Sequence, residues 1–329
     1  MEKSKKLNLL GQALLLLATI AWGTSFFILK DTISNSPTFY VIAIRFIVAG
    51  IGLSLIFIKK IIKIDKKTLL RGFVLGLFLT AAYFLQTIGL SYTTPGRNAF
   101  LTSSYCVMCP FIIWMIFRKR PKSYNVLSAI LCIVGIGFVS LAGSGESDSG
   151  MILGDGLTLL SAIFFGLQII YIDKFTQDGY DTVQMLIPEI FTVGIITTLY
   201  TLIFEMPVYS VSAYALSTEQ ILNIGYLTVA CTLFAQSAQI IGQRFTTANQ
   251  SSIILSLESV FGTFFSVIFA GEQLTALIIV GFVIVFISIL ISELKIDPVK
   301  LIFNKRSGNF NTNSQIKQEN IDQKKEGDV

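Results

Sequence analysis

Long apolar stretches recur from one end of the chain to the other, and short polar segments separate them. A helix needs about 20 mostly apolar residues to cross the hydrocarbon core of a bilayer. Ten stretches approach that length, so the pattern predicts an all-α, polytopic membrane protein with ten transmembrane helices. The predicted spans are 9–30, 38–58, 68–90, 97–117, 124–142, 153–174, 182–204, 217–241, 248–270 and 275–294. The polar residues 295–329 are predicted to form a largely disordered tail.

The composition is typical of a membrane protein rather than a soluble one. Hydrophobic residues make up 53% of the 329 positions and charged residues 14%, whereas a soluble domain carries about 25% charged residues. The mean hydropathy is +0.71. Histidine is absent, which removes the commonest general base and metal ligand, and we expect no metal or other cofactor. The four cysteines lie inside apolar stretches and are interpreted as packing residues.

Lysine and arginine are concentrated in three segments: residues 3–6, the second loop (59–67) and the fourth loop (118–122). All three fall on one side of the predicted topology. Because basic loops stay on the cytoplasmic side, both termini are predicted to be cytoplasmic, and the acidic loop 143–150 is predicted to face outward. Topology accounts for these charges, so nucleic-acid binding is not expected.

An internal repeat divides the chain into two similar halves. A shift of 153 positions aligns residues 72–111 with 225–264 without a gap. The identical pairs include Gln86/Gln239, Gly89/Gly242, Thr93/Thr246 and Thr94/Thr247. A shift of 143 positions aligns the first helix of each half and pairs Gly11 with Gly154. Apolar bias alone would not align polar residues and glycines in this way.

Each predicted half, residues 1–147 and 148–294, contains five helices. Because five is odd, the second half starts on the opposite side of the membrane, and the halves are predicted to be inverted repeats. In transporters built this way, the substrate site lies between the repeats near the middle of the membrane, and access alternates between the two sides. A duplicated scaffold without a transport pathway is the alternative.

Short motifs follow one another along both halves. They are Ala-Trp-Gly-Thr-Ser-Phe at 21–26, Pro37 with Arg45, Asn-Ala-Phe-Leu-Thr at 98–102 with Pro110, and Leu-Glu-Ser-Val-Phe at 257–261 leading to Glu272. Their order, together with the ten spans and the repeat, resembles EamA-type members of the drug/metabolite transporter (DMT) superfamily. The resemblance covers residues 9–294.

The resemblance implies a secondary transporter, commonly an exporter of amino acids or related small metabolites, in a bacterial cytoplasmic (inner) membrane. The chain is accordingly not expected to be an enzyme. No Gly-x-x-x-x-Gly-Lys-Ser/Thr motif for ATP occurs, which leaves an electrochemical gradient, for example of protons, or substrate exchange as the driving force. Two alternatives stay open: a membrane-embedded enzyme that acts on lipid-linked substrates, and a channel.

Three charged residues are predicted to lie deep in the membrane, where a charge costs at least about 2.5–3.5 kcal/mol. Glu258 is predicted to face a central cavity and either bind a substrate amine or carry a proton. Alternatively, it is a structural acceptor for neighbouring helices. Arg45 is interpreted first as a structural group, with Glu189 at a similar place in its own repeat as a candidate ion-pair partner.

Polar side chains recur on one face of two helices that the repeat relates. Tyr83 and Gln86 share a face of the third helix, and Gln236 and Gln239 share a face of the eighth, because residues three apart lie on the same side. The two faces are therefore predicted to meet between the halves and to line the pathway. Amides that only join helices are the alternative.

Further polar and aromatic residues are predicted to complete a small-molecule pocket. They are Trp22, Ser25, Asn98, Tyr105, Gln168 and Tyr171. Trp22 and Tyr105 could equally fill helix junctions. Lys30 lies near the end of a span, and its side chain is predicted to reach toward water.

Overall fold

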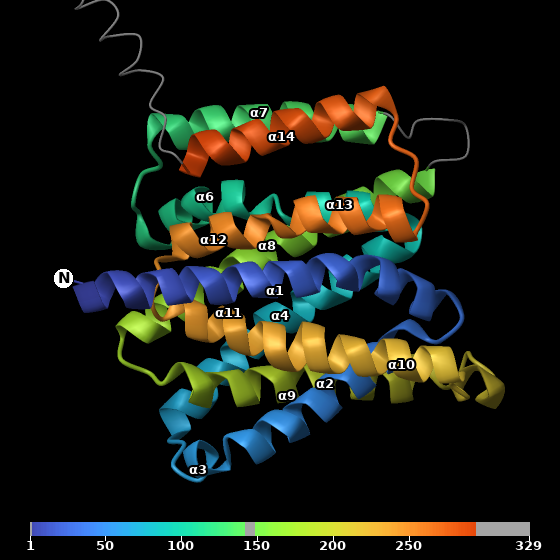
Figure 1. Cartoon of the computed structure of the whole chain (residues 1–329). Helices are drawn as coiled ribbons and strands as arrows, with labels where there is room; N and C mark the ends of the chain where they lie inside the picture. Colours follow the sequence, from blue (N-terminus) through green and yellow to red (C-terminus); the bar gives the residue numbers. More distant parts are fainter. Residues whose placement is uncertain (1, 142–148, 294–329) are drawn as a thin grey trace, which may run out of the picture.

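A computed structural model describes residues 2–141 and 149–293, and all regular secondary structure within these ranges is helical (Figure 1). The helices before the gap are α1 (Glu2–Ser34), α2 (Thr38–Ile56), α3 (Ile58–Ile61), α4 (Lys66–Tyr92), α5 (Pro95–Thr102), α6 (Tyr105–Phe117) and α7 (Ser123–Leu141). Those after it are α8 (Ser149–Gln177), α9 (Thr182–Tyr200), α10 (Thr218–Tyr226), α11 (Ala235–Gln243), α12 (Ala248–Ser256), α13 (Glu258–Phe269) and α14 (Ala276–Glu293). Two π-helical segments, η1 (Thr201–Glu205) and η3 (Leu227–Phe234), continue α9 and α10, and η2 (Val211–Tyr214) is a 3₁₀ helix. The predicted tail and nearly all of the predicted acidic loop lie outside the described residues.

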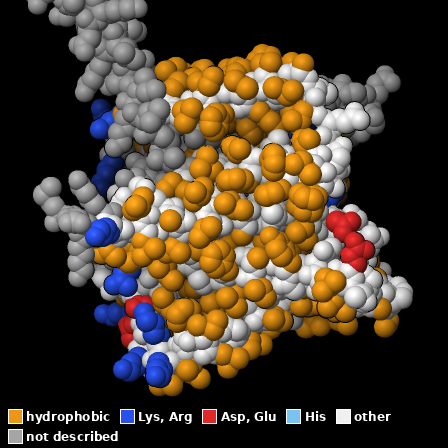
Figure 2. Space-filling view, in the orientation of Figure 1, with side chains coloured by type: hydrophobic (Ala, Val, Ile, Leu, Met, Phe, Trp, Pro, Cys, Tyr) orange, Lys and Arg blue, Asp and Glu red, His pale blue; other side chains and the backbone are white. Residues whose placement is uncertain are grey.

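The described helices include seven that are long and apolar enough to cross a membrane. Three shorter apolar helical segments overlap further predicted spans: Ser123–Phe138, Ile254–Phe269 and Ala276–Ser288. Apolar side chains cover a broad belt of the surface, whereas Lys and Arg gather at the end where α1 begins (Figure 2). The chain is therefore a helical, multi-pass membrane protein, as predicted. The number of ten crossings stays a prediction.

The predicted spans 97–117 and 248–270 each consist of two helices rather than one. Around each break the backbone tightens into i→i+3 hydrogen bonds, for example from Ser104 N to Leu101 O (3.1 Å). Leu257 N likewise bonds to the carbonyl three residues earlier (3.2 Å), so the buried backbone groups stay paired. The apolar pattern continues through both breaks, and hydropathy therefore does not reveal them. The 153-residue shift relates the two break positions.

Helices from both halves of the sequence meet in the middle of the bundle. α4 packs against α8 and α9, α1 packs against α11 and α13, and α7 lies beside α14 at one edge (Figure 1). A buried apolar cluster that includes Phe46, Leu79 and Met185 joins α2, α4 and α9. α4 approaches α9 closely at Gly72, where a Cβ atom would collide with Pro188. These contacts between distant segments hold the polar centre of the molecule in place.

Carboxylates from distant segments cap two helices at the end of the molecule opposite the N-terminus. Glu205, at the end of η1, accepts hydrogen bonds from Phe39 N (2.8 Å) and Tyr40 N (2.9 Å) in the first turn of α2. Glu272 accepts one from Gly96 N (2.9 Å) at the start of α5. The first N–H groups of a helix lack helical partners and favour negative charge, so both caps stabilise their helices.

An ion pair joins α3 to the start of α9 at the basic end of the molecule. Lys60 Nζ lies 2.7 Å from Asp181 Oδ2, and Asp181 also accepts hydrogen bonds from Val183 N and Gln184 N. Partial burial opposes ionisation, but the hydrogen bonds from Lys60 and from these backbone groups prevail and lower the pKa of Asp181. Both side chains of the pair are partly exposed, so solvent screening keeps its effect on stability small.

Candidate functional site

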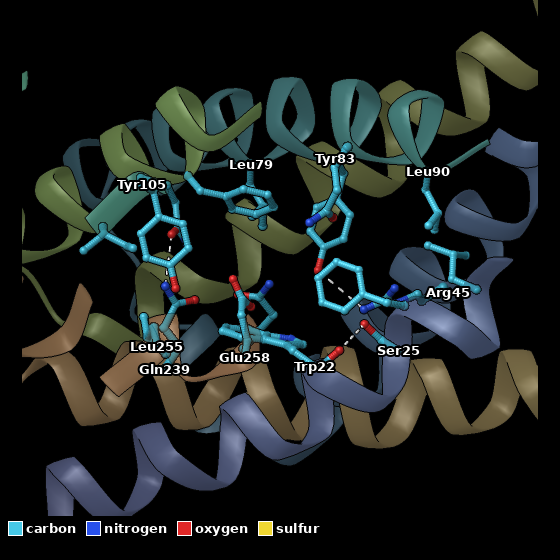
Figure 3. Close-up of a pocket in the computed structure, with 17 residues that line it drawn as sticks. Trp22, Ser25, Arg45, Leu79, Tyr83, Leu90, Tyr105, Gln239, Leu255 and Glu258 are labelled. Atoms are coloured by element: carbon cyan, nitrogen blue, oxygen red, sulfur yellow. Dashed lines mark hydrogen bonds between the residues drawn. The ribbon is translucent and has the colours of Figure 1, made fainter. Parts of the chain in front are cut away.

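A small cavity of about 40 Å³ lies in the middle of the bundle, between helices of both halves of the chain (Figure 3). The predicted site residues that line it are Trp22, Ser25, Arg45, Tyr83, Gln86, Tyr105, Gln168, Gln236, Gln239 and Glu258. Its two charged side chains are buried, since Arg45 is 1% exposed and Glu258 is 6% exposed. Apolar residues that the sequence did not single out, among them Leu79, Leu90 and Leu255, complete the wall. The cavity thus combines one cation, one carboxylate, several amides and apolar surface.

The two helix breaks each bring one polar side chain to the cavity. Tyr105 is the first residue of α6 and Glu258 is the first residue of α13, and the 153-residue shift relates the two positions. Both side chains are buried, and they hydrogen-bond to each other. Both residues were predicted from the sequence, Glu258 as a charge deep in an apolar stretch and Tyr105 as a polar aromatic residue, and the breaks explain why they point into the cavity.

Arg45 reaches the cavity from α2. Its Nε donates a short hydrogen bond to the hydroxyl of Thr232 in η3, and its Nη2 lies 3.5 Å from the hydroxyl of Tyr83. The guanidinium also lies over the Tyr83 ring, 5.4 Å from its centroid. Thr232 itself donates to the carbonyl of Leu227, five residues earlier, as a π-helical turn allows. None of the ion pairs among the described residues includes Arg45.

Glu189 is a second buried carboxylate close to the cavity, and it pairs with an amide. Its Oε1 accepts a hydrogen bond from Gln168 Nε2 at 2.7 Å, and Gln168 Oε1 accepts one from Gln239 Nε2 at 3.1 Å. The two glutamines line the cavity, and Glu189 lies beyond them. The candidate ion pair between Arg45 and Glu189 is not formed in the structure: Glu189 bonds to Gln168, and Arg45 bonds to Thr232.

Comparison with known proteins decides the family of the chain. The model of the EamA-like transporter family matches residues 9–141 and 152–294. The chain belongs to the EamA-like transporter family. A protein of Archaeoglobus fulgidus named "Uncharacterized transporter" is 28% identical over 282 residues, which is 86% of this chain and 85% of that protein. "Uncharacterized transporter YvbV" of Bacillus subtilis is 27% identical over 183 residues, 55% of this chain and 59% of its own length.

The fold has a counterpart among solved structures. One crystal structure superimposes with a TM-score of 0.63 at 12% sequence identity and covers 86% of this chain and 97% of its own. At that identity, the likeness concerns the fold alone. The family and the names of the relatives make this EamA-family chain a membrane transporter rather than an enzyme.

Three predicted site residues of this EamA-family transporter are not in the wall of the cavity: Asn98, Tyr171 and Glu189. Asn98 donates to Thr158 Oγ1 at 2.7 Å and to the backbone carbonyl of Gln86 at 3.1 Å, so it joins α5 to α8 and α4. Tyr171 packs among aromatic rings of α4, α6 and α8. Their contribution to transport stays a prediction.

A buried ion pair close to the cavity escaped sequence reasoning. Arg97 of α5 and Asp155 of α8 pair with side chains that are 3% and 4% exposed, and Asp155 also accepts from Thr93 Oγ1 at 3.0 Å. Both charges lie at the starts of predicted spans, where a charge ordinarily reaches water. The sequence did contain one indication of this pair: the predicted spans 97–117 and 153–174 both start on the same side of the membrane, and opposite charges lie near their starts.

Lys30 of α1 turns toward α4 and is partly buried. Its Nζ donates to the backbone carbonyls of Leu90 (2.6 Å), Ser91 (2.9 Å) and Thr93 (3.2 Å). These carbonyls lie at the C-terminal end of α4, where helical acceptors lack partners and a cation is favourable. The prediction that Lys30 simply reaches water is therefore corrected: the side chain joins α1 to α4 beside the cavity residue Leu90.

Proposed function

We propose that this chain is a secondary active transporter that exports amino acids or related small metabolites by alternating access. The observation that supports the proposal most is the central cavity, whose wall holds both the guanidinium of Arg45 and the carboxylate of Glu258. An α-amino acid carries the complementary two charges within one small molecule.

In this proposal, Arg45 binds the substrate carboxylate and Glu258 binds the substrate amine. Figure 3 places Arg45 beside Ser25 and Leu90, and Glu258 beside Trp22, so the two charges approach the cavity from different parts of its wall. Arginine recognises a carboxylate through parallel N–H groups, and such charged hydrogen bonds are stronger than neutral ones. The apolar part of the wall would receive the substrate side chain.

The proposed architecture is the ten-helix inverted repeat, with residues 1–147 and 148–294 as the two repeats and 295–329 as a cytoplasmic tail. It is supported by the pairing of helix breaks and by the gathering of basic side chains at the end where α1 begins (Figure 2). By the positive-inside rule, that end is cytoplasmic, and the protein lies in the cytoplasmic membrane with both termini inside.

A proton gradient or substrate exchange would drive transport. Glu258 is the group in the cavity wall that could take up a proton when substrate leaves, because a buried carboxylate without a bound cation is costly in its charged form. Substrate amine and proton would then compete for the same carboxylate. This arrangement would couple export of the substrate to entry of a proton.

Ligand binding to the purified protein tests the proposed substrate. We expect α-amino acids to stabilise it against thermal unfolding. Analogues that lack either the amine or the carboxylate should bind at least about tenfold more weakly, since a charged hydrogen bond contributes about 1.5–3 kcal/mol. Arg45→Gln should abolish the preference for a carboxylate, and Glu258→Gln should abolish the preference for an amine.

Glu219→Gln is the matched control, because Glu219 is an exposed carboxylate on α10 that is not part of the cavity wall. It should bind ligands like the unmodified protein. The proposal is wrong if no amino acid stabilises the protein at millimolar concentration, or if the two analogues bind as well as the complete zwitterion.

A further inference from the structure

Two helix contacts, one toward each end of the molecule, repeat the same geometry. In the first, α1 meets α11 so closely that a Cβ atom on Gly11 would lie 2.8 Å from Gly242 O, and one on Gly242 would lie 2.8 Å from Gly11 O. Such a distance is far below van der Waals contact, so only glycine permits this approach at either position. We call this the α1–α11 contact.

The second contact joins α4 to α8 with the same distances. A Cβ atom on Gly89 would lie 2.8 Å from Gly154 O, and one on Gly154 would lie 2.8 Å from Gly89 O. The 143-residue shift relates Gly11 to Gly154, and the 153-residue shift relates Gly89 to Gly242. The neighbours agree as well, because Gly242 faces Leu15 and Gly89 faces the equivalent Thr158. The α4–α8 contact is thus the repeat-related copy of the α1–α11 contact.

The two contacts lie on either side of the cavity. Gly89 follows the cavity residue Gln86 by three residues along α4, and Gly242 follows Gln239 by three residues along α11. Three residues are nearly one helical turn, about 4.5 Å. α4 and α11 run in opposite directions, so one contact closes the cavity toward the end where α1 begins and the other closes it toward the opposite end (Figure 1).

We propose that the α1–α11 contact is the cytoplasmic gate of the cavity and that the α4–α8 contact is its outer gate. Closure of the outer gate buries Arg97, and the ion pair with Asp155 makes that burial possible. The proposal rests on the proposed alternating-access function and names the residues that perform it. Both gates are closed in this structure, and transport requires each to open in turn.

The outer gate differs from the cytoplasmic gate in its charges. Asp155 follows Gly154 directly and pairs with Arg97, while Arg97 Nε is buried without a hydrogen-bond partner. The repeat places the uncharged Gln12 and Gln250 at the corresponding positions of the cytoplasmic gate. Removing one partner of a buried pair leaves the other charge uncompensated, which strongly destabilises the buried state. Closure of the outer gate therefore depends on Asp155.

Accessibility of a thiol in the cavity tests the gates separately from transport. A Ser25→Cys variant in membrane vesicles of known orientation is treated with a membrane-impermeant maleimide from either side. Protein without this substitution gives the background from the four native cysteines, which are all buried. The measurement needs no substrate, so it does not depend on which compound the protein carries.

Gly89→Ala, added to Ser25→Cys, should hold the outer gate open, raise labelling from outside about tenfold or more, and lower labelling from the cytoplasm. Gly242→Ala should do the reverse. Gly156→Ala on α8 and Gly225→Ala on α10 are the matched controls, because a Cβ atom at either position meets nothing within 4 Å. Equal labelling of the Gly89→Ala and Gly156→Ala proteins overturns the gate assignment while leaving the transport function intact.

Asp155→Asn provides a second variant that introduces no steric clash. It should raise outside labelling of Ser25→Cys, because water in the open gate hydrates the unpaired Arg97, and adding Arg97→Gln should restore the original level. Unchanged labelling of Asp155→Asn overturns the role of the pair. A thiol at position 25 that reacts from neither side in any variant contradicts the transport pathway itself.

Discussion

Arg45 and Glu258 are held by hydroxyl groups rather than by an opposite charge of the protein. Thr232 and Tyr83 contact the guanidinium, and Tyr105 contacts the carboxylate. Hydroxyls can donate or accept a hydrogen bond, so they support a charged side chain without neutralising it. In the proposed function, this arrangement leaves both groups available to a ligand, whereas an ion pair within the protein would occupy them.

Trp22 offers a test of packing at this site. Its Nε1 donates to the backbone carbonyl of Cys231 at 2.8 Å and so joins α1 to η3. Trp22→Phe should lower the free energy of unfolding in detergent by about 1–3 kcal/mol, because a largely buried carbonyl loses its donor. Trp114→Phe is the control, since Trp114 is 43% exposed on the outer surface of the bundle. Equal effects of the two substitutions would contradict this role.

The helices themselves could be predicted because a membrane imposes a long apolar stretch on each of them. The breaks at Ser103–Ser104 and Leu257 could not, because a single turn of i→i+3 bonds leaves the apolar pattern unchanged. Most residues of the candidate site were found because a polar or charged group deep in an apolar stretch is costly and therefore informative. Arg97 and Asp155 were missed since they lie at span ends, and only the packing of α5 on α8 shows that they meet.

Helix capping by distant carboxylates gives a prediction at the level of elements. Glu205→Ala removes the acceptor for Phe39 N and Tyr40 N at the start of α2 and should destabilise the protein by about 1–2 kcal/mol. Glu205→Gln, which keeps one acceptor oxygen, should cost clearly less. Thermal unfolding of both purified variants measures the difference, and an equal loss in the two would show that the cap is not the cause.

The whole molecule has a basic end and two repeat-related helix contacts on either side of one cavity. This arrangement makes the orientation in the membrane central to the account, because inside and outside define which contact is the cytoplasmic gate. The positive-inside rule gives that orientation from the exposed lysines of the loops.

Cysteine labelling in intact cells checks the orientation. Lys63→Cys and Lys119→Cys lie in exposed segments of the basic end, and Glu219→Cys lies at the start of α10 at the opposite end. We expect an impermeant reagent outside the cell to modify only the Glu219→Cys protein. Modification of one lysine position but not the other would contradict the inverted topology.

The central claim is that the cavity carries a small zwitterion across the membrane, and counterflow in proteoliposomes tests it most directly. Vesicles with the purified protein are loaded with an unlabelled amino acid that stabilises it, and entry of the same labelled amino acid is followed. The account predicts saturable entry that is faster than in unloaded vesicles and is lost in Glu258→Gln. Entry that neither saturates nor responds to internal substrate would contradict the account and indicate a channel.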